Sequence, residues 1–163
     1  MRVAFITSFL ANVMVTLVSL LILPERVAIH FGLGGLPDSW APNLNSTLLM
    51  LGVHTLVFVR LYFSPKLLAT MPSRWISLPN RDYWLAPERR SEAVAKFSQL
   101  MWQFGTAVFL FMLLAGVLTM RANLSEPVRL EEGVLLIGLA VFLAYTAYWT
   151  IALLRAFRVP SSR

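Results

Sequence analysis

The sequence predicts an all-α integral membrane protein whose four transmembrane helices form two hairpins. The chain of 163 residues is 58% hydrophobic and only 13% charged, and a soluble domain of this length could not bury so many apolar side chains. The apolar residues fall into four blocks of about 20 residues, the length that crosses the roughly 30 Å hydrocarbon core of a bilayer. None of the blocks shows the strict polar–apolar alternation of a transmembrane β-barrel.

Each block is expected to be one helix, because a backbone in lipid must satisfy its own hydrogen bonds. The first block is interpreted as a retained anchor helix, because its apolar run is longer than a signal-peptide core and no small-x-small cleavage pattern precedes Glu25. We therefore expect a single membrane domain with spans 3–23, 44–63, 100–120 and 134–154, outer loops 24–43 and 121–133, a cytoplasmic segment 64–98 and a cytoplasmic tail 155–163.

The basic residues predict the orientation of the chain. Three of the 14 lysines and arginines lie on one side of the predicted spans, namely Arg26, Arg121 and Arg129. The other eleven lie on the opposite side: Arg2, Arg60, Lys66, Arg74, Arg81, Arg89, Arg90, Lys96, Arg155, Arg158 and Arg163. The positive-inside rule then places both termini and segment 64–98 in the cytoplasm. The net charge of +6 is explained by this asymmetry, so no nucleic-acid partner is expected.

The cytoplasmic segment 64–98 mixes prolines, aromatic residues and arginines. Its four prolines, the first of them Pro65, are expected to stop any continuous helix. A new helix is expected from about Pro87 into the third span near Gln99, with Glu92 and Lys96 as a stabilising pair. The segment either lies in the lipid headgroup region and orients the two hairpins, or it is a docking surface for a cytoplasmic regulator. The candidate interface residues are Arg74, Trp75, Asn80, Arg81, Tyr83, Trp84, Arg89 and Arg90.

Polar side chains share one face of the first span, since Ser8, Asn12, Thr16 and Ser19 follow the helical repeat. His54 lies near the middle of the second span, at about the depth of Asn12 in its antiparallel neighbour. The sequence predicts a hydrogen bond between Asn12 and His54. Because ionisable groups inside a membrane are candidates for function, this polar face and His54 are also candidates to line a transport path.

The outer loop 24–43 contains the stretch HFGLGGLPDSW between two apolar runs. Gly32, Gly34 and Gly35 permit the positive φ values of a tight reversal. His30 and Asp38 are expected to brace the loop through a hydrogen bond, and an amphipathic tryptophan ring is expected at the membrane edge. The candidate residues for ligand binding or for this clasp are His30, Gly35, Asp38 and Trp40.

No motif for catalysis or metal binding is recognisable in the chain. It has no cysteine, which excludes disulfides, thiolate nucleophiles and cysteine-based zinc sites. It has no phosphate-binding loop, no zinc-protease motif and no recognisable Ser-His-Asp arrangement. One histidine and a few carboxylates in the outer loop are a weak pattern for a metal. We therefore expect a non-enzymatic protein without a metal or a cofactor.

The stretch LPERVAIHFGLGGLPDSW resembles the signature of the domain-of-unknown-function family 1648 (DUF1648). In place of the usual asparagine the chain has Gly32, and Asn43 stands near the position of an expected lysine. ISLPNRDYWLAPERR is also similar to the cytoplasmic stretch that follows in many members. The residues that fit the signature are Leu23, Pro24, His30, Phe31, Gly35, Asp38 and Trp40.

The resemblance implies a multi-pass protein of the bacterial inner membrane. Members include the SdpI-type immunity proteins, which protect cells from a secreted toxin and also act in signalling. The first hypothesis is therefore a membrane protein that senses or neutralises an external peptide or toxin through the outer loop and couples to the cytoplasmic side. The second is a small transporter, or a subunit of one, that uses the polar face of span one and His54. The third is a membrane enzyme, which requires His30 and Asp38 to converge on a common point.

Overall fold

The computed structural model describes residues 1–159 and contains four long helices. These are α1 (Arg2–Ile22), α2 (Asn43–Thr70), α4 (Arg90–Leu124) and α5 (Glu132–Ala156), and each is long and apolar enough to cross a membrane. The predicted class of an α-helical membrane protein is therefore confirmed. Residues 160–163 of the predicted tail, Arg163 among them, lie outside the described residues.

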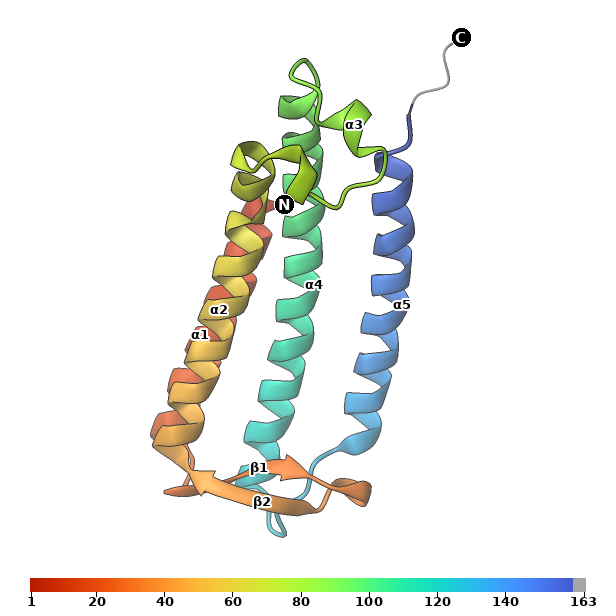
Figure 1. Cartoon of the computed structure of the whole chain (residues 1–163). Coiled ribbons are helices and arrows are strands. Elements are labelled where there is room, and N and C mark those ends of the chain that lie inside the picture. Colours follow the sequence, from red (N-terminus) through yellow and green to blue (C-terminus); the bar gives the residue numbers. More distant parts are fainter. Residues whose placement is uncertain (160–163) are drawn as a thin grey trace.

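The helices form a bundle of three with a fourth at its side. Helices α1, α2 and α4 pack against one another, whereas Figure 1 shows α5 beside α4, on the side away from α1 and α2. The indole of Trp149 in α5 donates a hydrogen bond to the Leu100 carbonyl at 2.9 Å. Phe111 and Phe142 stack across the same interface with ring centroids 5.0 Å apart. Most of the surface of α5 is therefore left to lipid.

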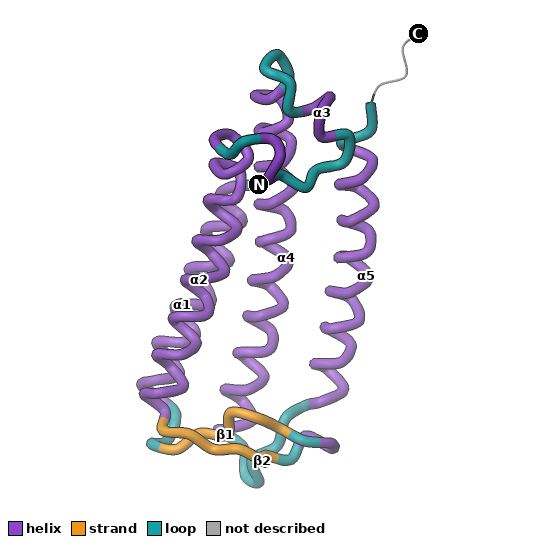
Figure 2. The backbone as a smooth tube through the Cα atoms, in the orientation of Figure 1, coloured by secondary structure: helices purple, strands orange, loops and turns teal. Residues whose placement is uncertain are grey.

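A β-hairpin closes one end of the bundle and a short folded cap closes the other, as the strands and loops of Figure 2 show. The hairpin consists of β1 (Arg26–Phe31) and β2 (Pro37–Pro42), which pair in antiparallel fashion across a 3-10 turn at Leu33–Gly35. The cap, residues 71–89, includes a 3-10 turn at Ser73–Trp75 and the short helix α3 (Arg81–Trp84). The hairpin lies within the predicted outer loop 24–43, where we expected only a turn.

The second helix extends beyond its predicted end. Contrary to the expectation that Pro65 stops the helix, α2 continues through it to Thr70. A proline cannot donate to the carbonyl four residues earlier, which here belongs to Leu61. The Ser64 hydroxyl donates to that carbonyl at 3.0 Å, so the freed acceptor is satisfied and the helix continues.

The helix expected to run into the third span is present as α4. It begins at Arg90 rather than at Pro87 and continues without a break to Leu124. The predicted pair of Glu92 and Lys96 is confirmed, with 2.8 Å between its charged atoms. The N-terminus, the cap and the end of α5 lie together, opposite the hairpin (Figure 1). This arrangement agrees with the predicted topology, and the side of the membrane that each end faces stays a prediction.

Phenylalanines fill the cap half of the bundle. Phe5 and Phe109 are completely buried, and Phe5 stacks on Phe58 with ring centroids 5.1 Å apart. Phe9 contacts both Phe58 and Phe109, at 4.3 Å and 5.5 Å between centroids. These four rings, hereafter the phenylalanine cluster, pack α1, α2 and α4 tightly in this half of the bundle.

Candidate functional site: the hairpin and the cavity beneath it

The predicted clasp of the hairpin is present. The ring Nδ1 of His30 lies 2.6 Å from a carboxylate oxygen of Asp38. The two side chains are 69% and 49% exposed, so the pair lies on the surface of the hairpin. Trp40 is also exposed, at 44%, and lies opposite Ala28 in the register of the two strands.

The turn of the hairpin docks onto the loop that precedes α5. Gly34 and Gly35 have φ values of 77° and 72°, the left-handed conformation that glycine adopts without steric cost. Gly35 is also tightly packed, because a Cβ there would overlap the carbonyl oxygen of Leu130. Its carbonyl accepts from the Leu130 amide at 2.9 Å. Arg129 and Glu132 hold the two backbone groups of Gly34, at 2.9 Å and 2.8 Å. The two loops at this end therefore form one layer.

Asparagine side chains join this layer and the helices to one another. The Asn123 amide near the end of α4 bonds to both backbone groups of Ala28 in β1, at 2.7 Å and 3.0 Å. The Asn43 amide, at the start of α2, donates to the last carbonyls of α1, those of Ser19, Leu20 and Leu23, at 3.3–3.4 Å. Sequence analysis missed both roles, because each depends on carbonyl groups that become neighbours only in the fold.

The predicted hydrogen bond between Asn12 and His54 is wrong. The Asn12 amide donates instead to the carbonyls of Ser8 and Phe109, both at 2.8 Å, and so links α1 to α4. The Nδ1 atom of His54 is buried without a hydrogen-bond partner, and the whole residue is 5% exposed. A backbone carbonyl of α4 is thus the acceptor in the position where we expected the imidazole.

Asn12 and His54 do border a common space. A cavity of about 420 Å³ lies between α1, α2 and α4 beneath the hairpin. Its walls contain no charged side chain. Aliphatic and methionine side chains form much of the wall, and the polar residues include Asn12, Thr16, Asn43, Thr47, His54 and Asn123. The phenylalanine cluster packs the bundle from Phe109 toward the cap.

The cap residues divide into structural and exposed groups. The indole of Trp84 and the amide of Asn80 both donate to the Phe157 carbonyl, at 2.9 Å and 2.7 Å. Arg90 donates to the Leu68 carbonyl at 3.0 Å and also to that of Met71, and so holds the end of α2. The buried residues of this cap core are Leu68, Leu78, Trp84, Leu85, Ala93 and Phe157. Asn80, Trp84 and Arg90 are therefore structural, although we selected them as interface candidates.

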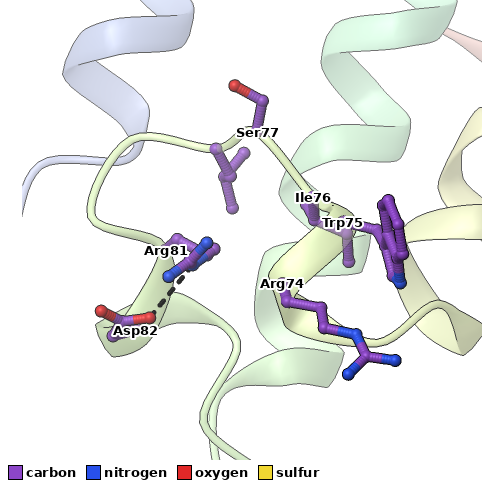
Figure 3. Close-up of a pocket in the computed structure, with 7 residues that line it drawn as sticks. Arg74, Trp75, Ile76, Ser77, Arg81 and Asp82 are labelled. Atoms are coloured by element: carbon purple, nitrogen blue, oxygen red, sulfur yellow. Dashed lines mark hydrogen bonds and ion pairs between the residues drawn. The ribbon is translucent and has the colours of Figure 1, made fainter.

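The remaining cap candidates lie at the surface. Figure 3 shows Arg81 paired with Asp82 across a surface pocket from Arg74 and Trp75. This pocket has a volume of about 430 Å³. Trp75 is 68% exposed and Arg74 lies over its ring. The remaining pair stacks, with the Arg89 guanidinium 4.1 Å from the Tyr83 ring centroid. Arg74 and Trp75 are both exposed and therefore accessible to a partner.

Within residues 1–159, no group of three histidine and acidic side chains is placed to hold a metal ion. His30 and Asp38 come together as the enzyme hypothesis requires, but they contact each other. The pair therefore forms a clasp between the two strands.

Comparison with known proteins identifies one family. Residues 7–54 match the sequence model of a domain of unknown function, DUF1648. No curated protein and no solved structure matches the chain. The matched residues include α1 from Thr7, the whole hairpin and α2 as far as His54, and every cavity-lining residue of these three elements falls within this range. The part of this membrane protein that is similar to DUF1648 is therefore the α1–hairpin–α2 unit, residues 7–54.

Proposed function

We propose that this protein is a non-enzymatic, SdpI-like membrane protein that binds an external peptide or toxin through the hairpin β1–β2. The supporting observation is the pair of exposed leucines at the turn of the hairpin, Leu33 and Leu36. Leu33 is 93% exposed and Leu36 is 58% exposed, and neither lines the cavity between the helices. Exposed apolar side chains gathered on one small element are typical of an interaction surface.

The open edge of β2 offers a second mode of contact. The sheet has two strands, so β2 pairs with β1 on one side and leaves its other edge free for an added strand. An extended peptide can pair with such an edge through main-chain hydrogen bonds. Pro37 and Pro42 lack a backbone N–H, so the donors on this edge must come from residues 38–41. The bound segment is therefore expected to be short.

Coupling to the cytoplasmic side is proposed to go through α4. One end of this helix holds β1 through Asn123, and the other end contributes Ala93 to the cap core. The exposed cap residues Arg74 and Trp75 lie beside that core and would meet a cytoplasmic regulator. The absence of any recognisable catalytic motif in the sequence supports binding rather than catalysis.

A peptide selection tests the binding proposal. A random peptide library displayed on phage would be selected on the protein in lipid nanodiscs, with empty nanodiscs removing lipid binders. Enriched peptides are expected to lose most of their binding to the double variant Leu33→Ser/Leu36→Ser. Leu124→Ser is the matched control, since Leu124 is an exposed leucine at the same end of the bundle but outside the hairpin. Equal loss with the control, or no enrichment over empty nanodiscs, would refute the proposal.

A cell assay tests the immunity aspect separately. Cells with and without this protein would be challenged with the peptide toxins that competing bacteria secrete. Higher survival with the intact protein, lost in Leu33→Ser/Leu36→Ser at normal membrane levels, is expected. Equal survival in all strains would remove the immunity function and leave peptide binding to the nanodisc experiment.

The cavity favours a second candidate function, transport. It borders Asn12, Thr16 and Ser19 of the polar α1 face and also His54, as a transport path would. The phenylalanine cluster argues against an open path, because its two central rings are completely buried on the cap side of the cavity. Transport would therefore require these rings to separate. Solute uptake into proteoliposomes, compared with empty liposomes, distinguishes this candidate from a binding protein.

A further inference from the structure

The cavity beneath the hairpin has the dimensions and walls of a small-molecule site. Its volume of about 420 Å³ falls within the roughly 300–1,000 Å³ of ligand pockets. The walls carry no charged side chain, so a charged molecule would lose its hydration without gaining an ion pair. The occupant that fits this space is neutral and mainly apolar.

Several polar groups of the wall are engaged within the protein. Thr16 and Ser19 donate to carbonyls of their own helix at 2.8 Å, and Thr47 donates to the Asn43 side chain at 3.4 Å. His54 differs, because the residue lines the cavity and its Nδ1 atom has no hydrogen-bond partner among the described residues. An unpaired polar atom in such a place is costly. His54 therefore brings a ring with an unpaired nitrogen to a mainly apolar wall.

The walls also indicate where a molecule would come from. Leu49 and Met50 line the cavity and are 62% and 40% exposed, so the wall formed by α2 is open rather than closed over by other elements. The bundle is packed toward the cap by Phe5 and Phe109, which are fully buried. A molecule would therefore enter sideways, between α2 and α4, from the bilayer.

We propose that this cavity binds a neutral, hydroxyl-bearing amphiphile from the membrane, with the hydroxyl on His54 and the apolar chain along the aliphatic wall. A hydroxyl both donates and accepts, so it can pair with a nitrogen of the His54 ring in either tautomer. An alkane lacks this bond, and a fatty acid anion or an alkylammonium brings a charge that the walls do not balance. This site is independent of the peptide surface on the hairpin.

Photolabelling in nanodiscs tests the proposal. The probe is a decanol analogue with a diazirine in its chain, and the labelled residues are located by mass spectrometry. Labels are expected on cavity residues such as Met50 and Met112. Competition by 1-decanol should exceed that by decane, decanoate or decylamine by about three- to tenfold, the ratio expected of one hydrogen bond. Equal competition by decane and decanol would overturn the role of the hydroxyl.

Two glycines provide a matched pair of variants. A Cβ at Gly116 or at Gly52 would meet no other atom within 4 Å, so both helices tolerate a side chain there. Gly116 lines the cavity and Gly52 does not. Gly116→Phe should abolish the labels on cavity residues, whereas Gly52→Phe should leave them unchanged. Labels that persist in Gly116→Phe, or that spread evenly over the lipid-facing surface of α5, would show surface lipid only and overturn the proposal.

His54→Leu separates the two parts of the site. It keeps an apolar wall and removes both ring nitrogens, so decanol should lose its advantage over decane while cavity labelling itself remains. An unchanged preference for decanol would refute the assignment of His54. The competition series on the unaltered protein decides the proposal even where a variant fails to fold.

Discussion

The side-chain amide of Asn123 forms a reciprocal pair of hydrogen bonds with the backbone of Ala28. Its oxygen accepts from the Ala28 N–H at 2.7 Å, and its nitrogen donates to the Ala28 carbonyl at 3.0 Å. Asn123 thereby pairs with β1 as a neighbouring strand would, and it is 7% exposed. One side chain of α4 therefore fixes the position of β1 relative to the helices.

Asn123→Ala is expected to loosen the hairpin. The substitution leaves the buried N–H and carbonyl of Ala28 without this partner, and such a loss costs about 1–3 kcal/mol. Hydrogen exchange at residues 26–42 should rise, while exchange in the middle of α4 stays unchanged. Asn45→Ala is the control, because Asn45 is an exposed asparagine at the same end of the bundle. Equal exchange in both variants would show that the hairpin is held by other contacts.

Gly35→Ala is expected to separate the hairpin from the loop before α5. The new Cβ would overlap the Leu130 carbonyl, in addition to the cost of about 1–2 kcal/mol for a non-glycine residue in the left-handed region. Gly34→Ala isolates the second effect, since Gly34 has a similar φ and no atom within 4 Å of its Cβ position. The apparent Tm in detergent should fall further for Gly35→Ala. Equal shifts would mean that packing on Leu130 contributes nothing.

The pair of His30 and Asp38 is expected to contribute little to stability. Both side chains are largely exposed, and exposed ion pairs usually contribute about 0–1 kcal/mol. A double-mutant cycle with His30→Ala and Asp38→Ala, followed by thermal unfolding, should give a coupling energy in that range. A much larger coupling would mean that the clasp determines the hairpin. A small coupling combined with lost peptide binding would instead assign the pair to recognition.

Trp84→Phe is expected to weaken the attachment of α5 to the cap. The ring stays apolar, but the hydrogen bond to the Phe157 carbonyl is lost and only the Asn80 donor remains. The expected loss is about 1 kcal/mol, measured as a lower apparent Tm and faster exchange near residue 157. Trp75→Phe is the control, because Trp75 is 68% exposed, and its Tm should not change.

Gly105→Ala is expected to destabilise the cap half of the bundle. A Cβ at Gly105 would overlap the ring of Phe5, which has no exposed surface. Forcing added volume into a packed core typically costs about 1–3 kcal/mol. Gly116→Ala, which meets no atom, should leave stability unchanged or raise it slightly through better helix propensity. Similar Tm values for the two variants would contradict the close packing of α1 against α4.

The spans could be predicted from the sequence because a helix that crosses the bilayer needs an apolar block of about 20 residues, and such blocks are visible in the composition. The hairpin could not, because Pro37 and Pro42 argue against a strand when the chain is read alone. In the fold they stand at the two ends of β2, where their missing donors do little harm. The continuation of α2 through Pro65 was missed for a similar reason, since it depends on the Ser64 hydroxyl bonding to Leu61.

The candidate site could be predicted only in part. The clasp of His30 with Asp38 was accessible because both residues lie in one short loop and have matching chemistry. Asn12 and His54 were predicted to lie at a similar depth in two antiparallel helices, and both do line one cavity. Depth alone does not reveal which backbone carbonyl a third helix presents, so the bond from Asn12 to Phe109 was missed.

The length of α4 has a mechanical consequence. Its 35 residues extend about 52 Å at 1.5 Å per residue, roughly 20 Å more than the hydrocarbon core. One continuous helix therefore connects the hairpin to the cap. A tilt of about 5°, pivoting at the hairpin end, would move the far end by about 4–5 Å for a helix of this rise. A small tilt at the hairpin end would thus displace the start of α4 against the cap.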